Sequence, residues 1–123
     1  MGSDVLVVDD DAAIRDLLHQ VLHDEGFAVR TVANASEAWM AISIREPGLM
    51  FLDVAMPDMP GTELFIKIRD AAYTFPIALI TAAPANVAAF AQRHQVACIA
   101  KPFDLSAIID CAAQHLPHAT KPL

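Results

Sequence analysis

Five short apolar runs alternate along the chain with five segments of helical spacing, and this alternation limits the fold more than any other feature. The apolar runs are Val5 to Val8, Phe27 to Val32, Leu49 to Leu52, Ile77 to Ile80 and Val96 to Ala100. Runs of this length and composition are typical of strands buried on both faces of a parallel sheet. We therefore predict an α/β fold with an open, doubly wound, five-stranded parallel sheet. Five strand–helix units are too few for an eight-stranded barrel.

Residues with strong positional preferences mark the ends of the predicted helices. Asp11, Asn34 and Asp104 favour helix starts, Pro84 suits a first helical turn, and Gly26 suits a left-handed helix end. The first helix is predicted to bury an apolar stripe formed by Ile14, Leu17, Leu18, Val21 and Leu22.

The acidic balance of the chain excludes two classes of partner. Eight Lys and Arg residues stand against fifteen Asp and Glu residues, which gives a formal net charge of −7. So few cations argue against direct binding of DNA or RNA and against binding to an anionic membrane surface. The uncharged segment 71–92 is interrupted by Pro76 and Pro84, so we do not interpret it as a membrane span. Since the first residues do not resemble a secretory signal, we expect a cytoplasmic domain.

Several residues that bind metals or react in other proteins are interpreted here as structural. Cys98 and Cys111 lie in apolar runs without the spacing of metal ligands or of a redox pair, so we expect reduced thiols in the core. His19 and His23 lie off the apolar stripe of the first helix and lack a third ligand, so we expect them on a solvated face. Trp39 is expected to serve packing.

Polar side chains directly follow four of the predicted strands. They are Asp9, Asp10 and Asp11 after the first strand, Asp53 after the third, Thr81 after the fourth and Lys101 after the fifth. In open α/β sheets the carboxyl ends of the strands meet at one edge, where ligands bind. Crowded carboxylates repel one another unless a cation neutralises them, and an oxygen-only ligand set favours Mg²⁺ or Mn²⁺. With an ammonium and a hydroxyl nearby, such a site suits phosphoryl transfer.

Each of these residues also has an ordinary structural explanation when it is taken alone. An Asp after a strand is commonly a turn residue or a helix cap, and Asp11 alone is best read as a cap. Thr81 alone would be a strand-end residue, and Lys101 alone would be solvated. Their occurrence together at four strand ends favours the functional interpretation. The sequence has no glycine-rich phosphate loop, so nucleotide binding of the usual kinds is not expected.

Four motifs carry a resemblance to a known family. They are Val-Val-Asp-Asp at 7–10, Leu-Asp-Val-Ala-Met-Pro-Asp-Met-Pro-Gly at 52–61, Ile-Thr-Ala at 80–82 and Lys-Pro-Phe at 101–103. In this order and spacing, the chain resembles a CheY-like response-regulator receiver domain from about Val5 to Leu116. The resemblance implies a flavodoxin-like sheet of strand order 2-1-3-4-5. It also implies a receiver domain over 1–116. Pro117 is predicted to end the last helix, and 117–123 is expected to be a flexible tail or the start of a linker.

The resemblance implies a role for each residue of the acidic group. Asp53 matches the phosphoacceptor, which takes a phosphoryl group from a sensor histidine kinase or a phosphotransfer protein. Asp10 matches the direct Mg²⁺ ligand, and Asp9 matches the acidic residue that usually acts through water. Ala55 matches the position whose backbone carbonyl completes the metal site. A domain of this kind is a signalling protein and not an enzyme, since it promotes only its own phosphorylation and dephosphorylation.

The resemblance also implies how a signal leaves the site. Thr81 matches the switch hydroxyl and Lys101 the phosphate-contacting lysine, with a cis peptide bond expected at Lys101–Pro102. The output face would be formed by the fourth helix, the fifth strand and the fifth helix, and would contact an effector domain, another partner or a second copy after phosphorylation. Cys98 stands where such domains often place an aromatic switch residue, so the coupling to this face is expected to differ. Because Ala55 and Ala83 are short, we expect an acyl phosphate that is not unusually long-lived.

Two other functions compete with this interpretation. The first is a small haloacid-dehalogenase-like phosphatase with Asp9 as nucleophile and Asp11 as acid. The second is a degenerate receiver that acts as a phosphorylation-independent docking module. The charge distribution favours a cation site: residues 1–60 hold eleven acids and three bases, whereas residues 61–123 hold four acids and five bases. We read this asymmetry as a field that favours a divalent cation near Asp9, Asp10 and Asp53.

Overall fold

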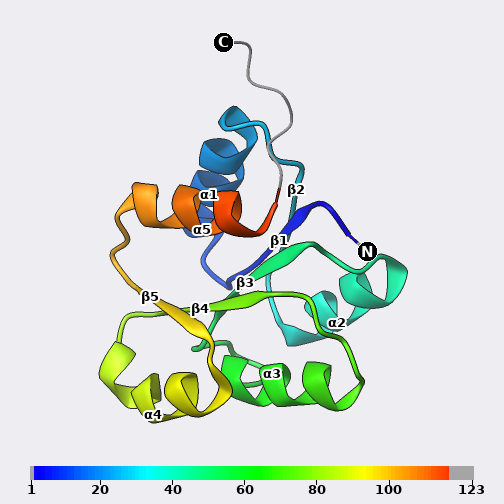
Figure 1. Ribbon diagram of the computed structural model, residues 1–123, viewed down its shortest axis with the longest axis vertical. Helices are drawn as coiled ribbons and strands as arrows, with labels where there is room; N and C mark the ends of the chain where they lie inside the picture. The colour runs from blue at the N-terminus through cyan, green and yellow to red at the C-terminus, as the bar shows by residue number, and fades with distance from the viewer. Residues whose placement is uncertain (1, 117–123) are drawn as a thin grey trace.

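The computed structural model describes residues 2–116, which form a five-stranded parallel sheet of order β2-β1-β3-β4-β5 (Figure 1). The strands are β1 Val5–Val8, β2 Val29–Val32, β3 Leu49–Asp53, β4 Ile77–Thr81 and β5 Ala97–Ala100. The predicted fold class and strand order are confirmed. The three interior strands β1, β3 and β4 are buried at every residue, as expected for continuously apolar runs.

Five helices cover the two faces of this sheet. Helices α1 (Ala12–Asp24) and α5 (Leu105–His115) lie on one face. Helices α2 (Ala35–Ile44), α3 (Gly61–Asp70) and α4 (Pro84–His94) lie on the other (Figure 1). This division follows from strand order: the chain steps from β1 outward to β2, then crosses back past β1 to β3, and right-handed crossovers then place the later helices.

Two apolar clusters, one on each face, form the core. Alternate residues of one strand serve opposite clusters: Val5 and Val7 pack with α1 and α5, whereas Leu6 and Val8 pack with α2 and α3. The sheet therefore has no solvated face at its centre. Its carboxyl edge is held in place by core packing from both sides.

The helix boundaries follow the predicted local signals. The Asp11 side chain caps α1 by accepting hydrogen bonds from the backbone N–H groups of Ala13 and Ile14. Asn34 and Asp104 cap α2 and α5 in the same way, and Pro84 occupies the first turn of α4. Gly26 follows α1 with a φ of 93°, the left-handed conformation that glycine adopts without strain.

The predicted start of the second strand was wrong by two residues. The chain enters β2 at Val29, and Phe27 is a buried core residue outside the strand. The backbone N–H of Phe27 donates to the carbonyl of Leu22 at 3.1 Å, which belongs to the end of α1. Because that N–H is engaged in terminating the helix, it is not available for pairing with β1.

The fifth strand was wrongly predicted to be buried. Ala97, Cys98 and Ala100 are exposed on β5, and only Ile99 packs against the α1–α5 cluster. The expectation of a core thiol therefore holds for Cys111, which is buried, and fails for Cys98. The reason is that β5 is an edge strand, paired on one side only, with small side chains over which the helices do not close.

The predicted apolar stripe of the first helix was also wider than the stripe that the structure buries. Leu18 and Leu22 are fully buried, but Leu17 is 43% exposed. No helix within residues 2–116 is long and apolar enough to cross a membrane. The expected helix end at Pro117 and the expected tail over 117–123 lie outside the described residues.

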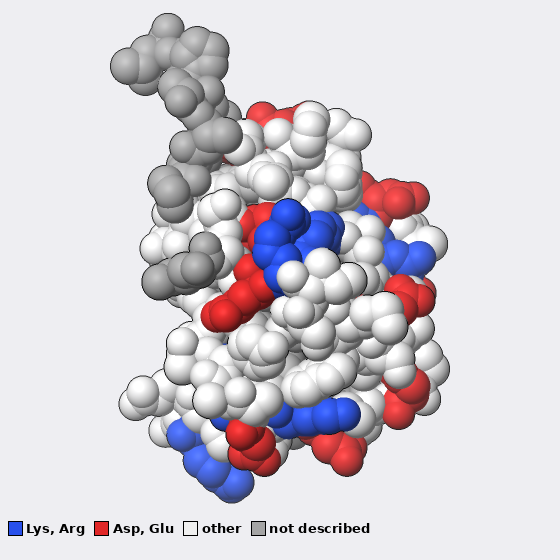
Figure 2. Space-filling model, turned by 90° about the vertical axis from the view of Figure 1, so that its right-hand side faces the viewer, with Lys and Arg blue, Asp and Glu red and all other residues white. Residues whose placement is uncertain are grey.

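An ionic cluster at the amino end of the sheet joins β1, β2 and α2. Asp4, only 4% exposed, pairs with the guanidinium of Arg30 and lies 3.3 Å from that of Arg45. The guanidinium of Arg30 also donates to the backbone carbonyls of Ala41 at 3.0 Å and Arg45 at 2.8 Å, near the end of α2. Figure 2 views the molecule from this end and shows positive side chains interleaved with negative ones, without a continuous basic surface.

Removal of Arg30 should destabilise the protein far more than removal of Arg45. Arg30→Ala removes the nearer and more buried partner of the Asp4 carboxylate, leaves only the exposed Arg45 beside it, and takes the Arg30 donor from two backbone carbonyls. It should lower the free energy of unfolding by about 3 kcal/mol. Arg45→Ala is the matched control, because the Arg45 side chain is 63% exposed. It should cost less than about 1 kcal/mol. Urea unfolding of both variants measures the difference, and equal losses would contradict the central role of Arg30.

Candidate functional site

The pairing of the strands brings the sequence-predicted site residues to one edge of the sheet. In the parallel register, Val8 lies beside Leu52, Asp53 beside Ile80, and Thr81 beside Ala100. The residues that follow these strands therefore emerge next to one another at the carboxyl edge. Asp9, Asp10, Asp53, Thr81 and Lys101 all lie there, as predicted.

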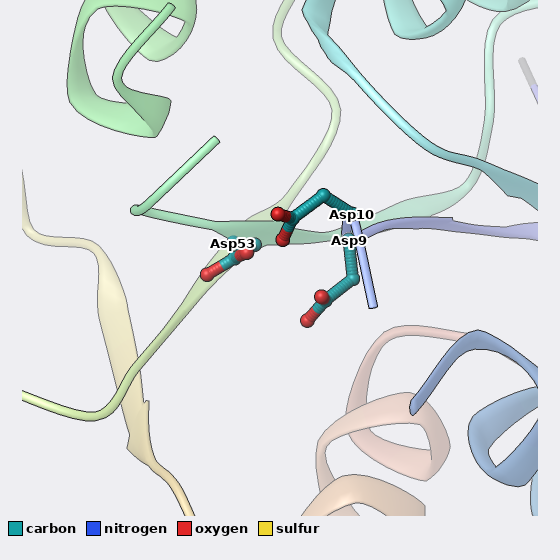
Figure 3. A group of neighbouring side chains, drawn as sticks. All are labelled: Asp9, Asp10 and Asp53. Carbon is teal, nitrogen blue, oxygen red and sulfur yellow. The ribbon is translucent and has the colours of Figure 1, made fainter. Parts of the chain in front are cut away.

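Three carboxylates converge at this edge (Figure 3). Oxygen atoms of Asp9, Asp10 and Asp53 all lie within 4.8 Å of one another. Asp9 and Asp53 are buried at 0% and 2% exposure, whereas Asp10 is exposed at the mouth of the site. Among residues 2–116, this acidic cluster is the one group of three or more side chains that could hold a metal ion.

One ammonium group partly compensates the acidic cluster. The Nζ atom of Lys101 lies 2.8 Å from Oδ2 of Asp9 and 3.4 Å from Oδ1 of Asp53. Burial lowers the pKa of Lys101, but the contacts with the two carboxylates outweigh it and raise the pKa above its usual value. Lys101 is therefore charged at neutral pH. The expected cis peptide bond at Lys101–Pro102 is present.

Asp53 shows the electrostatic cost of this crowding. Burial and the neighbouring charge of Asp9 raise the pKa of Asp53 from 3.8 to about 6, against the opposing effects of Lys101 and of a hydrogen bond from the Ala55 N–H. Three carboxylates with a single ammonium leave an excess of negative charge facing a common point. Oxygen ligands in an incompletely compensated acidic site are what a hard divalent cation such as Mg²⁺ requires, so the donor set fits that ion.

Thr81 is buried at the end of β4, within the same edge. Its hydroxyl oxygen accepts a hydrogen bond from the Ala83 N–H at 3.0 Å, and its carbonyl accepts one from the Lys101 N–H at 2.8 Å. The second bond ties β4 directly to the residue that carries the ammonium. Thr81 still has its hydroxyl proton to donate to a negatively charged ligand.

Arg15, which the sequence analysis did not single out, and Asp11, which it placed at a helix start, fix the loop that carries Asp9 and Asp10. The guanidinium of Arg15 donates to the Asp9 carbonyl at 2.8 Å, and the Asp11 N–H donates to Oδ1 of Asp9 at 2.9 Å. Asp11 at the same time caps α1. Arg15 lies one helical turn after Asp11, and that spacing was the available signal for its position.

The loop after Asp53 returns to the sheet at Gly61. A Cβ atom on Gly61 would lie 2.3 Å from the carbonyl oxygen of Asp53, so only glycine fits at this close approach. The Gly61 N–H donates to the Val54 carbonyl at 2.8 Å and closes the loop at its neck. The loop therefore begins and ends beside Asp53, with Ala55 exposed next to the acidic cluster.

The remaining candidates lie apart from the acidic cluster. Cys98 is exposed on β5, and its side chain is too small to act as the aromatic switch residue. His19 and His23 are exposed on α1 with their rings stacked at 5.9 Å, as expected for a solvated face. Trp39, on α2, makes a T-shaped ring contact with Tyr73 and packs against the apolar cluster of that face, as expected for a structural residue.

Known proteins resemble this chain over nearly its whole length. The family model for the response regulator receiver domain matches residues 5–113. The chain is 36% identical over 110 residues to the DNA-binding transcriptional regulator NtrC of Rhizobium meliloti (strain 1021), covering 88% of this chain and 23% of that protein. It is 28% identical over 120 residues to sporulation initiation phosphotransferase F of Bacillus subtilis (strain 168), covering 95% of this chain and 96% of that protein.

A solved structure agrees with these sequence matches. The receiver domain of NtrX from Brucella abortus aligns with a TM-score of 0.83 and 35% identity, covering 92% of this chain and 98% of that chain. The chain spans about a quarter of the length of the NtrC proteins that it matches. It therefore corresponds to one domain of those longer regulators.

Replacement of Asp53 by Asn should stabilise the metal-free protein, and the gain should grow with pH. Between pH 3.8 and about 6 the folded chain holds a proton on Asp53 that the unfolded chain has released. Raising the pH through this window therefore lowers the free energy of unfolding of the native chain, by on the order of 2 kcal/mol. Asn does not titrate, so Asp53→Asn should not show this loss. Urea unfolding in EDTA at about pH 4 and about pH 7 measures the difference; a gain independent of pH would contradict the raised pKa.

Proposed function

The chain belongs to the response regulator receiver domain family, and we propose that it accepts a phosphoryl group on Asp53 from a phosphohistidine of a sensor kinase or phosphotransfer protein. The observation that carries the proposal is the convergence of Asp9, Asp10 and Asp53 with Lys101 at the carboxyl edge of the sheet. The family places this chain among signalling domains of two-component systems. The choice of acceptor, metal and donor is our proposal.

In the proposed reaction Asp53 is the nucleophile. Its pKa of about 6 leaves the carboxylate mainly ionised at neutral pH, and a bound cation would lower that pKa further. A carboxylate oxygen attacks phosphorus, the P–N bond to the donor imidazole breaks, and the electron pair leaves on nitrogen, which takes a proton from solvent. Lys101 stabilises the charge of the transferred phosphoryl oxygens, because its ammonium already lies beside Asp53.

Asp9, Asp10, Asp53 and the backbone carbonyl of Ala55 would hold Mg²⁺, or Mn²⁺ in its place. The bound ion would neutralise charge on the carboxylates and on the phosphoryl oxygens. The exposed position of Asp10 suits direct contact with an ion that keeps several water ligands. Asp9 is buried and held by Arg15, Asp11 and Lys101, which suits a contact through water.

We further propose that phosphorylation shifts the face formed by α4, β5 and α5. Thr81 and Lys101 would be drawn to the acyl phosphate, and the hydrogen bond between their backbones would carry the shift to β5. Val87 is the one buried residue of helix α4, and Phe90 and His94 pack against Phe65, so limited packing opposes movement of the helix. With Cys98 in place of an aromatic residue, the movement of α4 and the loop before it replaces a rotating side chain.

This face would contact an effector domain, another partner or a second copy of the chain. The relatives support this part of the proposal, because the NtrC proteins are named as transcriptional regulators and extend well beyond the matched domain. A receiver domain over 1–116 that acts in the cytoplasm and binds no nucleic acid itself is consistent with the acidic composition.

The phosphatase alternative receives little support from the geometry. Asp9, its nucleophile, is 0% exposed and pairs with Lys101. Asp11, its acid, is engaged with the first backbone N–H groups of α1. Both carboxylate oxygens of Asp9 are engaged, Oδ1 by the Asp11 N–H and Oδ2 by Lys101, whereas the Ala55 N–H and Lys101 both contact Oδ1 of Asp53. An engaged nucleophile and an acid occupied in a helix cap do not suit attack on a substrate. The docking-module alternative predicts no phosphorylation of the chain. The acetyl phosphate experiment that follows distinguishes it from the proposed function.

Acetyl phosphate with Mg²⁺ should add one phosphoryl group to the native chain, measured as intact mass. Asp53→Asn should abolish the adduct, because the amide is not a nucleophile for this reaction. A phosphatase would keep its chemistry in Asp53→Asn and lose it in Asp9→Asn. If the native chain stays unmodified under conditions that label a control receiver domain, the proposed function is wrong and the docking module is favoured.

A further inference from the structure

The tip of the loop 54–60 is bound to the start of α2. Both carboxylate oxygens of Asp58 are used: Oδ1 accepts from the Ala35 N–H at 3.0 Å and Oδ2 from the Ser36 N–H at 3.1 Å. The partners lie 23 and 22 residues earlier in the chain. These two N–H groups belong to the first turn of α2, where helix donors lack partners within the helix.

Asp58 is not needed for ordinary capping of α2. Asn34 already caps the helix by accepting from the Glu37 N–H at 2.8 Å, and the Glu37 carboxylate accepts from the Ala33 N–H at 3.0 Å. Asp58 adds bonds to the two remaining donors of this turn from outside the helix. The N–H groups of Ala35 and Ser36 hold the pKa of Asp58 below its usual value, so the carboxylate is charged and complements the positive end of the helix dipole.

Ala55 lies between two fixed points of this loop. The neck is closed by the hydrogen bond from Gly61 to Val54, and the tip is held by Asp58. Ala55 is exposed and has no side chain that could anchor it, and its N–H donates to Oδ1 of Asp53 at 3.2 Å. The direction of its backbone carbonyl therefore depends on this hydrogen bond and on how both points are held.

We propose that Asp58 is a positioning residue for the divalent cation: by fixing the loop 54–60 to α2, it holds the Ala55 carbonyl where the cation takes it as a ligand. This inference rests on the proposed function of the site. It adds a mechanical link, because a cation held by the Ala55 carbonyl would tie the loop to the acidic cluster, and Asp58 ties the same loop to α2. Groups one step removed from metal ligands commonly change metal affinity by roughly tenfold or more when they are removed.

The single tryptophan of the chain lies where this link can be observed. Trp39 lines a groove of about 230 Å³ between α2, the loop 54–60 and α3, together with Ser36, Asp58, Met59 and Lys67. The Nζ atom of Lys67 lies 4.8 Å from the centre of the Trp39 ring. Movement of the loop tip changes the surroundings of this ring, so its fluorescence should respond to Mg²⁺ in the native chain.

Mg²⁺ titrations of the folded protein test the assignment, with affinity measured by calorimetry and loop movement by Trp39 fluorescence. Asp58→Ala should weaken Mg²⁺ binding roughly tenfold and abolish the fluorescence response. Asp58→Asn keeps one acceptor oxygen and should fall between Asp58→Ala and the native chain. Asn34→Ala is the matched control: it removes a cap from the same helix end without touching the loop, and should lower the thermal midpoint while leaving Mg²⁺ affinity and the response unchanged.

The outcomes separate this inference from the proposed function. Native Mg²⁺ affinity in Asp58→Ala, or equal losses of affinity in Asp58→Ala and Asn34→Ala, would reduce Asp58 to a stabilising cap and overturn the inference, while Asp53 labelling still stands. If Asp58→Ala does not fold, Asp58→Asn takes its place in the test. Native Mg²⁺ affinity and a native Trp39 fluorescence response in Asp58→Asn would then overturn the inference. A native chain that binds no Mg²⁺ overturns both proposals.

Discussion

Repulsion among three carboxylates at one edge of the sheet is the interaction on which this molecule depends. Asp9, Asp10 and Asp53 stand close together with one ammonium between the two buried members. A flexible chain would relieve the repulsion by letting the side chains separate. Here the strands that deliver Asp9 and Asp53 are buried at every residue, so the separation is prevented by the cost of exposing the core. The apolar sheet thus maintains an arrangement that is unfavourable without a cation.

Contacts around the carboxyl edge also hold the three carboxylates in place. Arg15 and Asp11 fix the backbone and side chain of Asp9, the Lys101 backbone joins β5 to Thr81, and Gly61 lets the loop after Asp53 return at close range. Each contact removes a direction in which the acidic group could relax. Preorganised charge of this kind is useful for phosphoryl transfer, since little covalent chemistry is asked of the protein.

The interior strands and the residues of the site could be predicted from the sequence. The edge strands β2 and β5 were predicted less well. The bounds of strands β1, β3 and β4 were predicted within one residue, because a short uninterrupted apolar run is typical of a strand buried on both faces of a sheet. The site residues came together because parallel strands end at a common edge. The exposed β5 and the late start of β2 were missed, because edge position and helix termination are not encoded in local hydropathy. Asp58 and Arg30 were missed because their partners are distant in sequence.

The ionic cluster of Asp4 and Arg30 lies at the amino end of the sheet, and the acidic cluster lies at the carboxyl end. Stability and chemistry are therefore supplied from opposite ends of the same strands. Changes at Arg30 act mainly on the fraction of folded molecules and so on cellular abundance, whereas each surviving molecule keeps an intact acidic edge. A variant of Arg30 that impairs signalling would do so by lowering the amount of folded protein. Raising its expression should therefore restore signalling.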